Sequence, residues 1–221
     1  MRVVVNAAMS ADGKLSTRRR EQVAISGPED FARVDRLRAA SDAVMVGVGT
    51  VLADDPHLTL DAVALQADRS AAGDAPQPAR VVADSRARTP ADAEILDDAA
   101  ETYVFVADVA ADADVAALRD AGATVIEAGE ERVDLAAALD ALEERGIERL
   151  MVEGGGELIA ALFAADLVDE LSTFVGGQVI GGREAPTLAD GDGFVGSFPA
   201  LDLVDVERLD DGVVLHWSVI D

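Results

Sequence analysis

Short apolar runs rich in β-branched residues alternate with amphipathic, alanine- and leucine-rich stretches as far as about residue 165. The apolar runs predict strands buried on both faces. They are Val3–Ala8, Ala43–Gly47, Arg80–Ala83, Thr102–Val106, Thr124–Glu127 and Arg149–Glu153. The amphipathic stretches predict helices at Pro28–Ala40, Asp112–Ala121, Asp134–Arg145 and Glu157–Ala165. This alternation favours a parallel sheet with helices on both faces.

The C-terminal part has a different pattern. Val168–Val175, Leu201–Arg208 and Val213–Ile220 are apolar runs without a helical pattern between them, and Asp210-Asp211-Gly212 predicts a hairpin turn. We therefore expect an α/β protein with a mixed, mostly parallel sheet and antiparallel C-terminal strands. The composition of residues 61–79 is typical of a surface loop. No shift in composition marks a boundary, so we expect one domain over residues 1–221.

Composition excludes several classes of protein. Half of the 221 residues are hydrophobic, which excludes a disordered chain, and the absence of cysteine excludes a disulfide scaffold or a thiolate nucleophile. No apolar run approaches the ~20 residues that a membrane span needs. The first residues run into the turn chemistry of Ser10-Ala11-Asp12-Gly13 and do not look like a signal peptide. We expect a soluble, cytoplasmic protein.

The charge is strongly acidic, with 43 acidic and 18 basic side chains and a net charge of −25. Such a field repels nucleic acids and anionic membranes, so neither is expected as a partner. The scattered carboxylates indicate a solvated surface adapted to high salt, as in halophilic proteins. Lys14 is the only lysine and follows Asp12-Gly13. It is a candidate for a specific function, with an ordinary exposed lysine as the alternative.

The strongest local motif is a glycine-rich turn. The apolar run ending at Glu153 passes through Gly154, Gly155 and Gly156 directly into the helix predicted from Glu157. Backbone N–H groups and the positive end of the helix then favour an anion, and glycine lets a phosphate approach. The turn lacks the lysine of a Walker loop and the G-x-G-x-x-G spacing of a dinucleotide fold. The alternative is an ordinary strand-to-helix turn.

Two other predicted strand ends carry polar side chains. After Gly47, Thr50 and Asp54 lie four residues apart and share one face if this segment is helical; alternatively, Thr50 caps the helix and Asp54-Asp55-Pro56 ends it. After the next strand, Ser85 is followed by Arg86 and Arg88, which suit a nucleotide's extra phosphate or act as surface counter-charges. Because ligands bind at the carboxyl edge of open α/β sheets, the three ends together favour a nucleotide site.

Other chemistries have few candidate residues. The two histidines, His57 and His216, lie on unrelated segments, and no G-x-S-x-G elbow is present. We therefore expect neither a hydrolase nor a metal site. Hydride transfer from a bound nicotinamide fits better, because the cofactor supplies the reactivity.

Six motifs, taken in order along the chain, resemble the pyrimidine reductase family of riboflavin biosynthesis, in particular its stand-alone archaeal and fungal members. They are Asn6–Leu15, Arg33–Ala39, Val46–Thr59, Asp84–Pro90, Glu153–Leu158 and Gly181–Thr187. The resemblance implies a dihydrofolate-reductase-like, three-layer α-β-α fold, a homodimer, and NADPH (in some members NADH) as cofactor. It also implies reduction of the ribosylamino group of 2,5-diamino-6-ribosylamino-4(3H)-pyrimidinone 5′-phosphate to ribitylamino.

The resemblance also assigns site residues. The cofactor-binding positions are Thr50, Asp54, Ser85, Gly154, Gly155, Gly156 and Glu157. The substrate-binding positions are Asn6, Arg38, Leu58 and Glu153, with Arg38 on the 5′-phosphate. Glu153 is the candidate catalytic acid/base, with Lys14 or Asp12 assisting it or holding hydroxyl groups.

The sequence departs from the family pattern at two positions. Asp35 stands where the family usually has histidine, and Asp61 where two-domain bacterial relatives have arginine. A deaminase half with its zinc-binding pattern is absent from the sequence, so we do not expect deamination. The alternatives are reduction of the deaminated 5-amino-6-ribosylaminouracil phosphate, reduction of another small heterocycle, and a non-catalytic nucleotide-binding protein.

Overall fold

The computed structural model describes residues 1–21 and 23–220. The chain forms two compact units: the first contains Met1 and Asp35–Met151, and the second contains Arg2–Val34 and Val152–Asp221. The boundary falls inside helix α1 (Pro28–Ala39) and inside strand β6 (Arg149–Gly154).

Nine strands in the described part of the chain follow the hydrogen-bonding order β5-β4-β3-β2-β6-β1-β7-β9-β8. Besides β6, they are β1 (Arg2–Ser10), β2 (Ala43–Gly47), β3 (Ala79–Ala83), β4 (Thr102–Val106), β5 (Thr124–Glu127), β7 (Glu170–Gly176), β8 (Ala200–Leu209) and β9 (Gly212–Ile220). The remaining helices are α2 (Val48–Asp54), α3 (Val63–Ala72), α4 (Asp112–Asp120), α5 (Leu135–Glu143), α6 (Gly156–Ala164) and the short 3₁₀ helix η1 (Glu94–Leu96). The fold is therefore α/β, as predicted.

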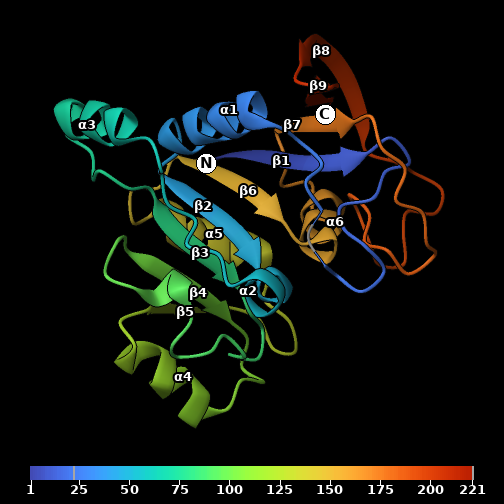
Figure 1. Cartoon of the computed structure of the whole chain (residues 1–221). Helices are drawn as coiled ribbons and strands as arrows, with labels where there is room; N and C mark the ends of the chain where they lie inside the picture. The colour runs from blue at the N-terminus through green and yellow to red at the C-terminus, as the bar shows by residue number, and fades with distance from the viewer. Residues whose placement is uncertain (22, 221) are drawn as a thin grey trace. The chain divides into compact units, whose positions relative to one another are not determined.

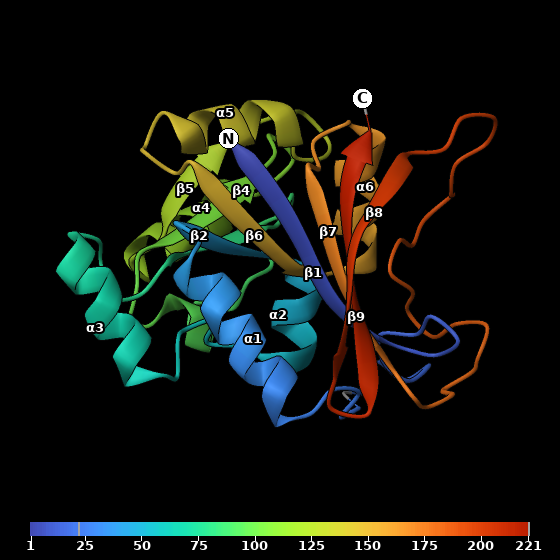
Figure 2. The same ribbon diagram turned by 90° about the horizontal axis from the view of Figure 1, so that it is seen from above.

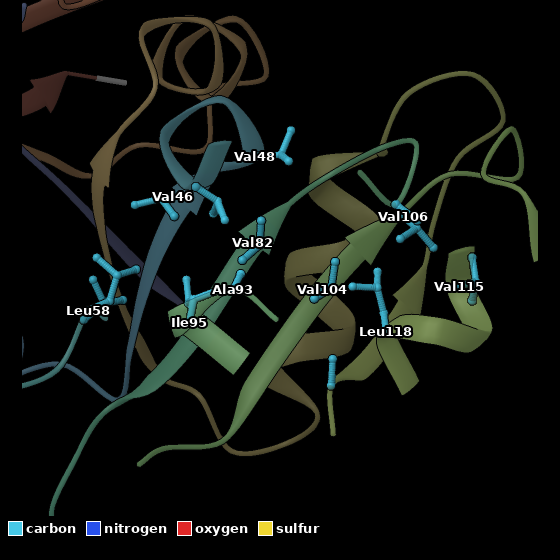
Figure 3. Packing of buried hydrophobic residues seen from close by; sticks show 14 residues of the cluster. Val46, Val48, Leu58, Val82, Ala93, Ile95, Val104, Val106, Val115 and Leu118 are labelled. Carbon is cyan, nitrogen blue, oxygen red and sulfur yellow. The ribbon is translucent and has the colours of Figure 1, made fainter. Parts of the chain in front are cut away.

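The first unit is built on the parallel strands β2, β3, β4 and β5. Alternate residues of a strand point to opposite faces, and one face carries Val82 and Val104 in a cluster that includes Leu118 of α4 (Figure 3). The buried residues of α5 are not in this cluster, and Figure 1 shows α5 behind these strands. Both faces of this part of the sheet are therefore covered.

The second unit combines a parallel and two antiparallel strand pairs. β1 and β7 are parallel and end in register at Ser10 and Gly176, whereas β9 runs antiparallel to both β7 and β8 (Figure 2). The predicted hairpin turn joins β8 to β9 at Asp210. The carboxylate of Asp210 also accepts hydrogen bonds from the amides of Glu29 (3.3 Å) and Asp30 (2.9 Å), the first turn of α1. The hairpin turn therefore caps a helix about 180 residues earlier in the chain.

The predicted strands and helices are confirmed to within two residues at most ends. The expectation of a surface loop over residues 61–79 is wrong, because Val63–Ala72 forms α3. This segment has only two large apolar residues, Val63 and Leu65, and the helix ends at Gly73, which has a φ of +98°. Arg69 anchors it by donating to the carbonyls of Ala39 and Ser41, both at 2.8 Å. The short helix η1 was also not predicted.

No helix formed by residues 1–21 and 23–220 is both long and apolar enough to cross a membrane.

Candidate active site

In the first unit, the polar side chains predicted at the ends of β2 and β3 lie at neighbouring strand ends. The two strands are parallel and paired, with Gly47 opposite Ala83, and α2 begins directly after β2 (Figure 1). Thr50 and Asp54 therefore lie on one helix four residues apart, as predicted. The alternative that Thr50 caps this helix is wrong, because the capping residue is Gly47. Asp55, in the left-handed conformation, ends the helix, as that alternative predicted.

Thr50 is half-buried, Asp54 is exposed, and neither side chain makes a hydrogen bond or ion pair with any residue that the structure describes. The backbone beside them is also open, because a Cβ on Gly49 would meet no atom within 4 Å. This helix surface therefore has room for a ligand and two polar groups to bind it.

The loop after β3 is held by a buried carboxylate. Asp84 is fully buried, and its Oδ2 accepts hydrogen bonds from the amide (2.7 Å) and hydroxyl (2.9 Å) of Thr89. Its Oδ1 has no hydrogen-bond partner among the described residues, and Arg88 Nε lies 3.7 Å from it. Ser85 Oγ accepts from the amide of Val133 (3.0 Å), so its own hydrogen remains available to a ligand. Arg86 and Arg88 are exposed on this fixed loop.

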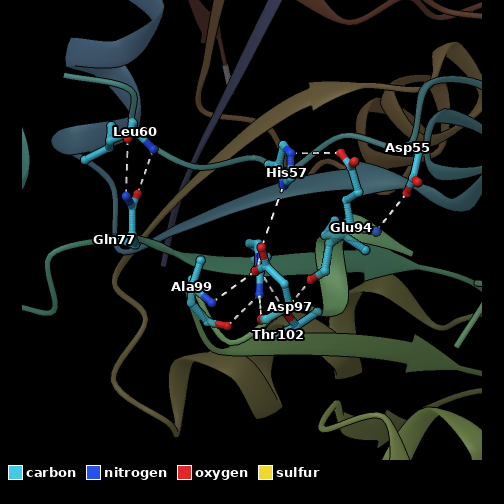
Figure 4. Close-up of polar contacts among 11 residues, drawn as sticks. Asp55, His57, Leu60, Gln77, Glu94, Asp97, Ala99 and Thr102 are labelled. Atoms are coloured by element: carbon cyan, nitrogen blue, oxygen red, sulfur yellow. Dashed lines mark hydrogen bonds and ion pairs between the residues drawn. The ribbon is translucent and has the colours of Figure 1, made fainter. Parts of the chain in front are cut away.

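The segment after α2 carries Leu58 and is fixed by polar contacts on both sides of it (Figure 4). His57 lies 2.9 Å from Glu94 and 3.7 Å from Asp97, and the Leu60 amide donates to Gln77 (2.6 Å). Arg80, fully buried, donates to the Asp97 carboxylate at 2.7 Å and thereby lowers its pKa.

Leu58 is buried in the apolar cluster of the first unit and has a φ of +52°. A left-handed conformation is strained for leucine, and such strain is concentrated at functional sites. Because the side chain of Leu58 is packed inside this cluster, any contact of Leu58 with a ligand would be made by its backbone. The half-buried Arg38 donates from Nη1 to the carbonyl of Thr59, the residue that follows Leu58 (2.8 Å).

In the second unit, the segment from Ser10 to Lys14 forms a tight turn at the end of β1. The Ser10 amide donates to the Lys14 carbonyl (2.9 Å), and the Lys14 amide donates to Ser10 Oγ (2.9 Å). Gly13 has a φ of +78°, which glycine adopts without strain. The turn therefore accounts for the spacing of serine, aspartate, glycine and lysine.

Asp12 is bound by the chain itself. Its carboxylate accepts hydrogen bonds from Ser10 Oγ (2.6 Å) and from the amides of Ile180 (3.0 Å) and Gly181 (2.8 Å). These donors, the Ser10 hydroxyl first, lower the pKa of Asp12 to about 2. A carboxyl group with this pKa is ionised at neutral pH and is a poor proton donor.

Asp12 and Lys14 both hold residues 178–190, which we call the strap. Lys14 Nζ donates to the carbonyl of Ala185 (3.2 Å), and Lys14 forms a β-bridge with Thr187. The strap then returns to the glycine-rich turn, where the amide of Asp190 donates to the carbonyl of Gly156 (3.0 Å). The strap thus connects the turn that carries Lys14 to the turn that follows Glu153.

The glycine-rich turn needs glycine for two different reasons. Gly155 has a φ of +93°. At Gly156, a Cβ would lie 2.5 Å from the Thr187 carbonyl oxygen and 2.6 Å from Asp190 Oδ2. Helix α6 begins at Gly156 with no side-chain cap, and Gly156 is buried against the strap. Glu153, at the end of β6, is half-buried, and Glu157, in the first turn of α6, is exposed.

Asn6 lies on β1 in a buried polar network that the sequence did not reveal. Its Oδ1 accepts a hydrogen bond from Nη2 of Arg33 (2.8 Å), a residue of α1. Arg33 also donates from Nη1 to Ser172 Oγ (2.9 Å) and from Nε to Asp30 (2.8 Å). Asp30 and Arg33 are three residues apart in the helix, a spacing that predicts an ion pair. The spacing does not predict that the ion pair is buried.

The chemistry of these groups fits a phosphorylated dinucleotide and a sugar phosphate. Hydroxyls, a carboxylate, exposed arginines and helix amides bind ribose and phosphate. Among the described residues, no group of three or more His, Cys, Asp or Glu side chains is arranged to hold a metal ion.

The family described as the RibD C-terminal domain matches residues 1–215. The chain belongs to that family.

Two archaeal relatives carry the name 2,5-diamino-6-ribosylamino-4(3H)-pyrimidinone 5′-phosphate reductase. The chain is 48% identical to the one from Archaeoglobus fulgidus, over 95% of this chain and 94% of the relative. It is 47% identical to the one from Methanothermobacter thermautotrophicus, over 86% of this chain and 84% of the relative.

Among solved structures, a pyrimidine reductase-like protein from Corynebacterium diphtheriae superimposes with a TM-score of 0.87 at 20% identity. The match covers 100% of this chain and 92% of that protein. The fold is therefore shared with that protein over the whole chain.

Proposed function

We propose that this chain reduces the ribosylamino group of 2,5-diamino-6-ribosylamino-4(3H)-pyrimidinone 5′-phosphate to ribitylamino in riboflavin biosynthesis, with NADPH as the reductant. The observation that carries the proposal is the 48% identity, over almost the full length of both chains, to the Archaeoglobus reductase. The open polar groups at the ends of β2 and β3 support it, because a binding site for a large phosphorylated cofactor requires such groups.

We assign Thr50, Asp54 and Ser85 of the first unit and Gly154–Glu157 of the second to the dinucleotide. When bound, a reduced nicotinamide supplies a hydride, which the side chains of this protein cannot provide. Arg86 and Arg88 follow Ser85 on the rigid loop and are the cations available to the extra phosphate of NADPH. NADH lacks that phosphate, so these arginines support NADPH as the preferred cofactor.

Reduction at C1′ requires the ribose ring to open to an imine and the product nitrogen to gain a proton. We assign the proton transfer to Glu153, the last residue but one of β6, beside the glycine-rich turn. We assign Lys14, whose Nζ donates to the Ala185 carbonyl, to the substrate hydroxyls or the ring oxygen. The low pKa of Asp12 disfavours proton donation, so we assign Asp12 a structural role. It orders the turn that carries Lys14 and the strap that Lys14 contacts. Arg38 is assigned to the 5′-phosphate.

The test offers the purified protein NADPH with the diamino compound and with its deaminated analogue, side by side in concentrated KCl. We expect rapid turnover of the diamino compound alone. Glu153→Gln is expected to lower kcat at least a hundredfold while the KM for NADPH changes less than threefold. Turnover of the deaminated compound alone would reverse the substrate assignment, and an unchanged kcat would remove Glu153 from the chemistry.

We also propose a homodimer that pairs through β8, the last strand in the hydrogen-bonding order. Its exposed apolar residues include Leu203 (52%), Val204 (67%) and Val206 (52%), which is unusual for an unprotected edge strand. Sedimentation in concentrated KCl should give a dimer, and Val204→Lys should shift it to a monomer. A wild-type monomer would contradict the proposal.

A further inference from the structure

Asn6 is buried, with 6% of its surface exposed, yet only its oxygen is bound. Its carboxamide accepts one hydrogen bond, from Arg33. Its amide nitrogen donates to no other residue among those that the structure describes. The nitrogen is not among the buried polar atoms that lack a partner, so it reaches the surface and can donate to a ligand from outside the chain.

Arg33 determines which end of the carboxamide is left over. A guanidinium group has five donors and no acceptor, so only the oxygen of Asn6 can face it. The three bonds to Asn6, Ser172 and Asp30, at 2.8–2.9 Å, use Nη2, Nη1 and Nε in one plane. Asn6 and Ser172 are also direct partners in the β1–β7 register, which fixes the spacing of the two acceptors.

Asp30 fixes Arg33 in turn. Arg33 is 7% exposed and Asp30 is 1% exposed, so the pair is shielded from solvent and keeps its geometry. Asp30 is held from the other side, because its amide donates to the Asp210 carboxylate at 2.9 Å. The orientation of the Asn6 carboxamide therefore depends on α1 and on the hairpin turn.

We propose that Arg33 is a positioning residue that turns the NH₂ group of Asn6 toward the bound substrate, where it donates to a lone-pair acceptor. The acceptor class is a carbonyl oxygen or unprotonated ring nitrogen of the pyrimidinone, and a ring N–H at that point would be rejected. The inference rests on the proposed function, because the ligand is its substrate.

The first test is Asn6→Asp, which keeps an oxygen for Arg33 and removes the donor. We expect kcat/KM for the pyrimidine to fall about tenfold or more, while the KM for NADPH stays within twofold. Asn6→Ala serves as a second variant if the extra buried charge prevents Asn6→Asp from folding. A folded variant with unchanged kcat/KM for the pyrimidine would overturn the inference.

The second test asks whether Arg33 acts through Asn6. Arg33→Lys keeps a charge for Asp30 but cannot reach three acceptors in one plane. Introduced alone, Arg33→Lys should raise the KM for the pyrimidine about tenfold. Added to Asn6→Ala, it should raise this KM by less than twofold. The matched control is Arg119→Lys, at an arginine of α4 in the first unit that pairs with Glu127, which should leave this KM unchanged.

An equal effect of Arg33→Lys in both backgrounds would show that Arg33 is only structural and would overturn the inference. That outcome differs from failure of the proposed function, in which the folded wild-type protein neither binds nor reduces the pyrimidine. In that case the inference fails together with the function on which it rests.

Discussion

The two units differ in whether the polar side chains near their strand ends are bound by other residues of the chain. In the first unit, Thr50 and Asp54 extend from a helix with no partner among the described residues, and the loops around them are fixed by other groups. In the second unit, Asp12 and Lys14 are engaged by the strap. The first unit therefore leaves polar groups on the surface of α2 without a partner in the described part of the chain, whereas the second uses polar side chains to build its turns.

The largest expected effect comes from Gly156→Ala, which tests whether the strap must pack against the start of α6. The new Cβ would lie 2.5 Å from a backbone oxygen, so we expect a loss of about 2 kcal/mol in stability and a large rise in the KM for NADPH. Gly49→Ala is the matched control in the first unit. It meets nothing within 4 Å and should increase stability by up to about 1 kcal/mol.

Thermal unfolding and NADPH titration of both glycine variants give the comparison. If Gly156→Ala kept wild-type stability, the close packing of the strap on this turn would be disproved. If Gly49→Ala weakened NADPH binding without a loss of stability, the cofactor would approach the backbone at that position.

Removing the open polar groups of the first unit should reduce cofactor binding with little effect on stability. Asp54→Asn and Thr50→Ala are each expected to raise the KM for NADPH about tenfold, with a stability change within about 0.5 kcal/mol. Asp68→Asn, at an exposed aspartate of α3, is the control and should change neither quantity. A large loss of stability in the Asp54 variant would mean that this carboxylate supports the fold.

The smallest effect concerns the acid stability that Asp12 contributes. Its pKa in the folded protein, about 2, is below the ordinary value of 3.8, so its contribution is complete above about pH 4 and is lost as the pH falls toward 2. The Tm of Asp12→Asn should therefore lie below that of wild type at pH 5, and the difference should shrink toward pH 2. Asp61→Asn, at another exposed carboxylate, is the control, and a Tm difference for Asp12→Asn that does not change with pH would contradict this assignment.

Much of the fold could be predicted from local sequence patterns. The buried strands of the first unit are continuous apolar runs, and the hairpin turn at Asp210 has a clear signature. Helix α3 was missed because Val63–Ala72 contains few large apolar residues, and it is held instead by Arg69, whose acceptors lie about 30 residues earlier in the chain.

The candidate site could be predicted only in part, for a similar reason. Motif spacing located Thr50, Asp54 and the glycine-rich turn, because each depends on neighbours in the sequence. The contacts of Asp12 with the strap join residues almost 170 positions apart, and Arg33 binds Asn6 across 27 positions. Local patterns carry no information on such pairs.

Reduction at C1′ is tested most directly by the transfer of deuterium from NADPH that carries deuterium at both hydrogen positions of the nicotinamide C4. We expect a ribitylamino product that carries one deuterium at C1′, found by mass spectrometry and NMR. An unlabelled product, or deuterium on the pyrimidine ring, would contradict it.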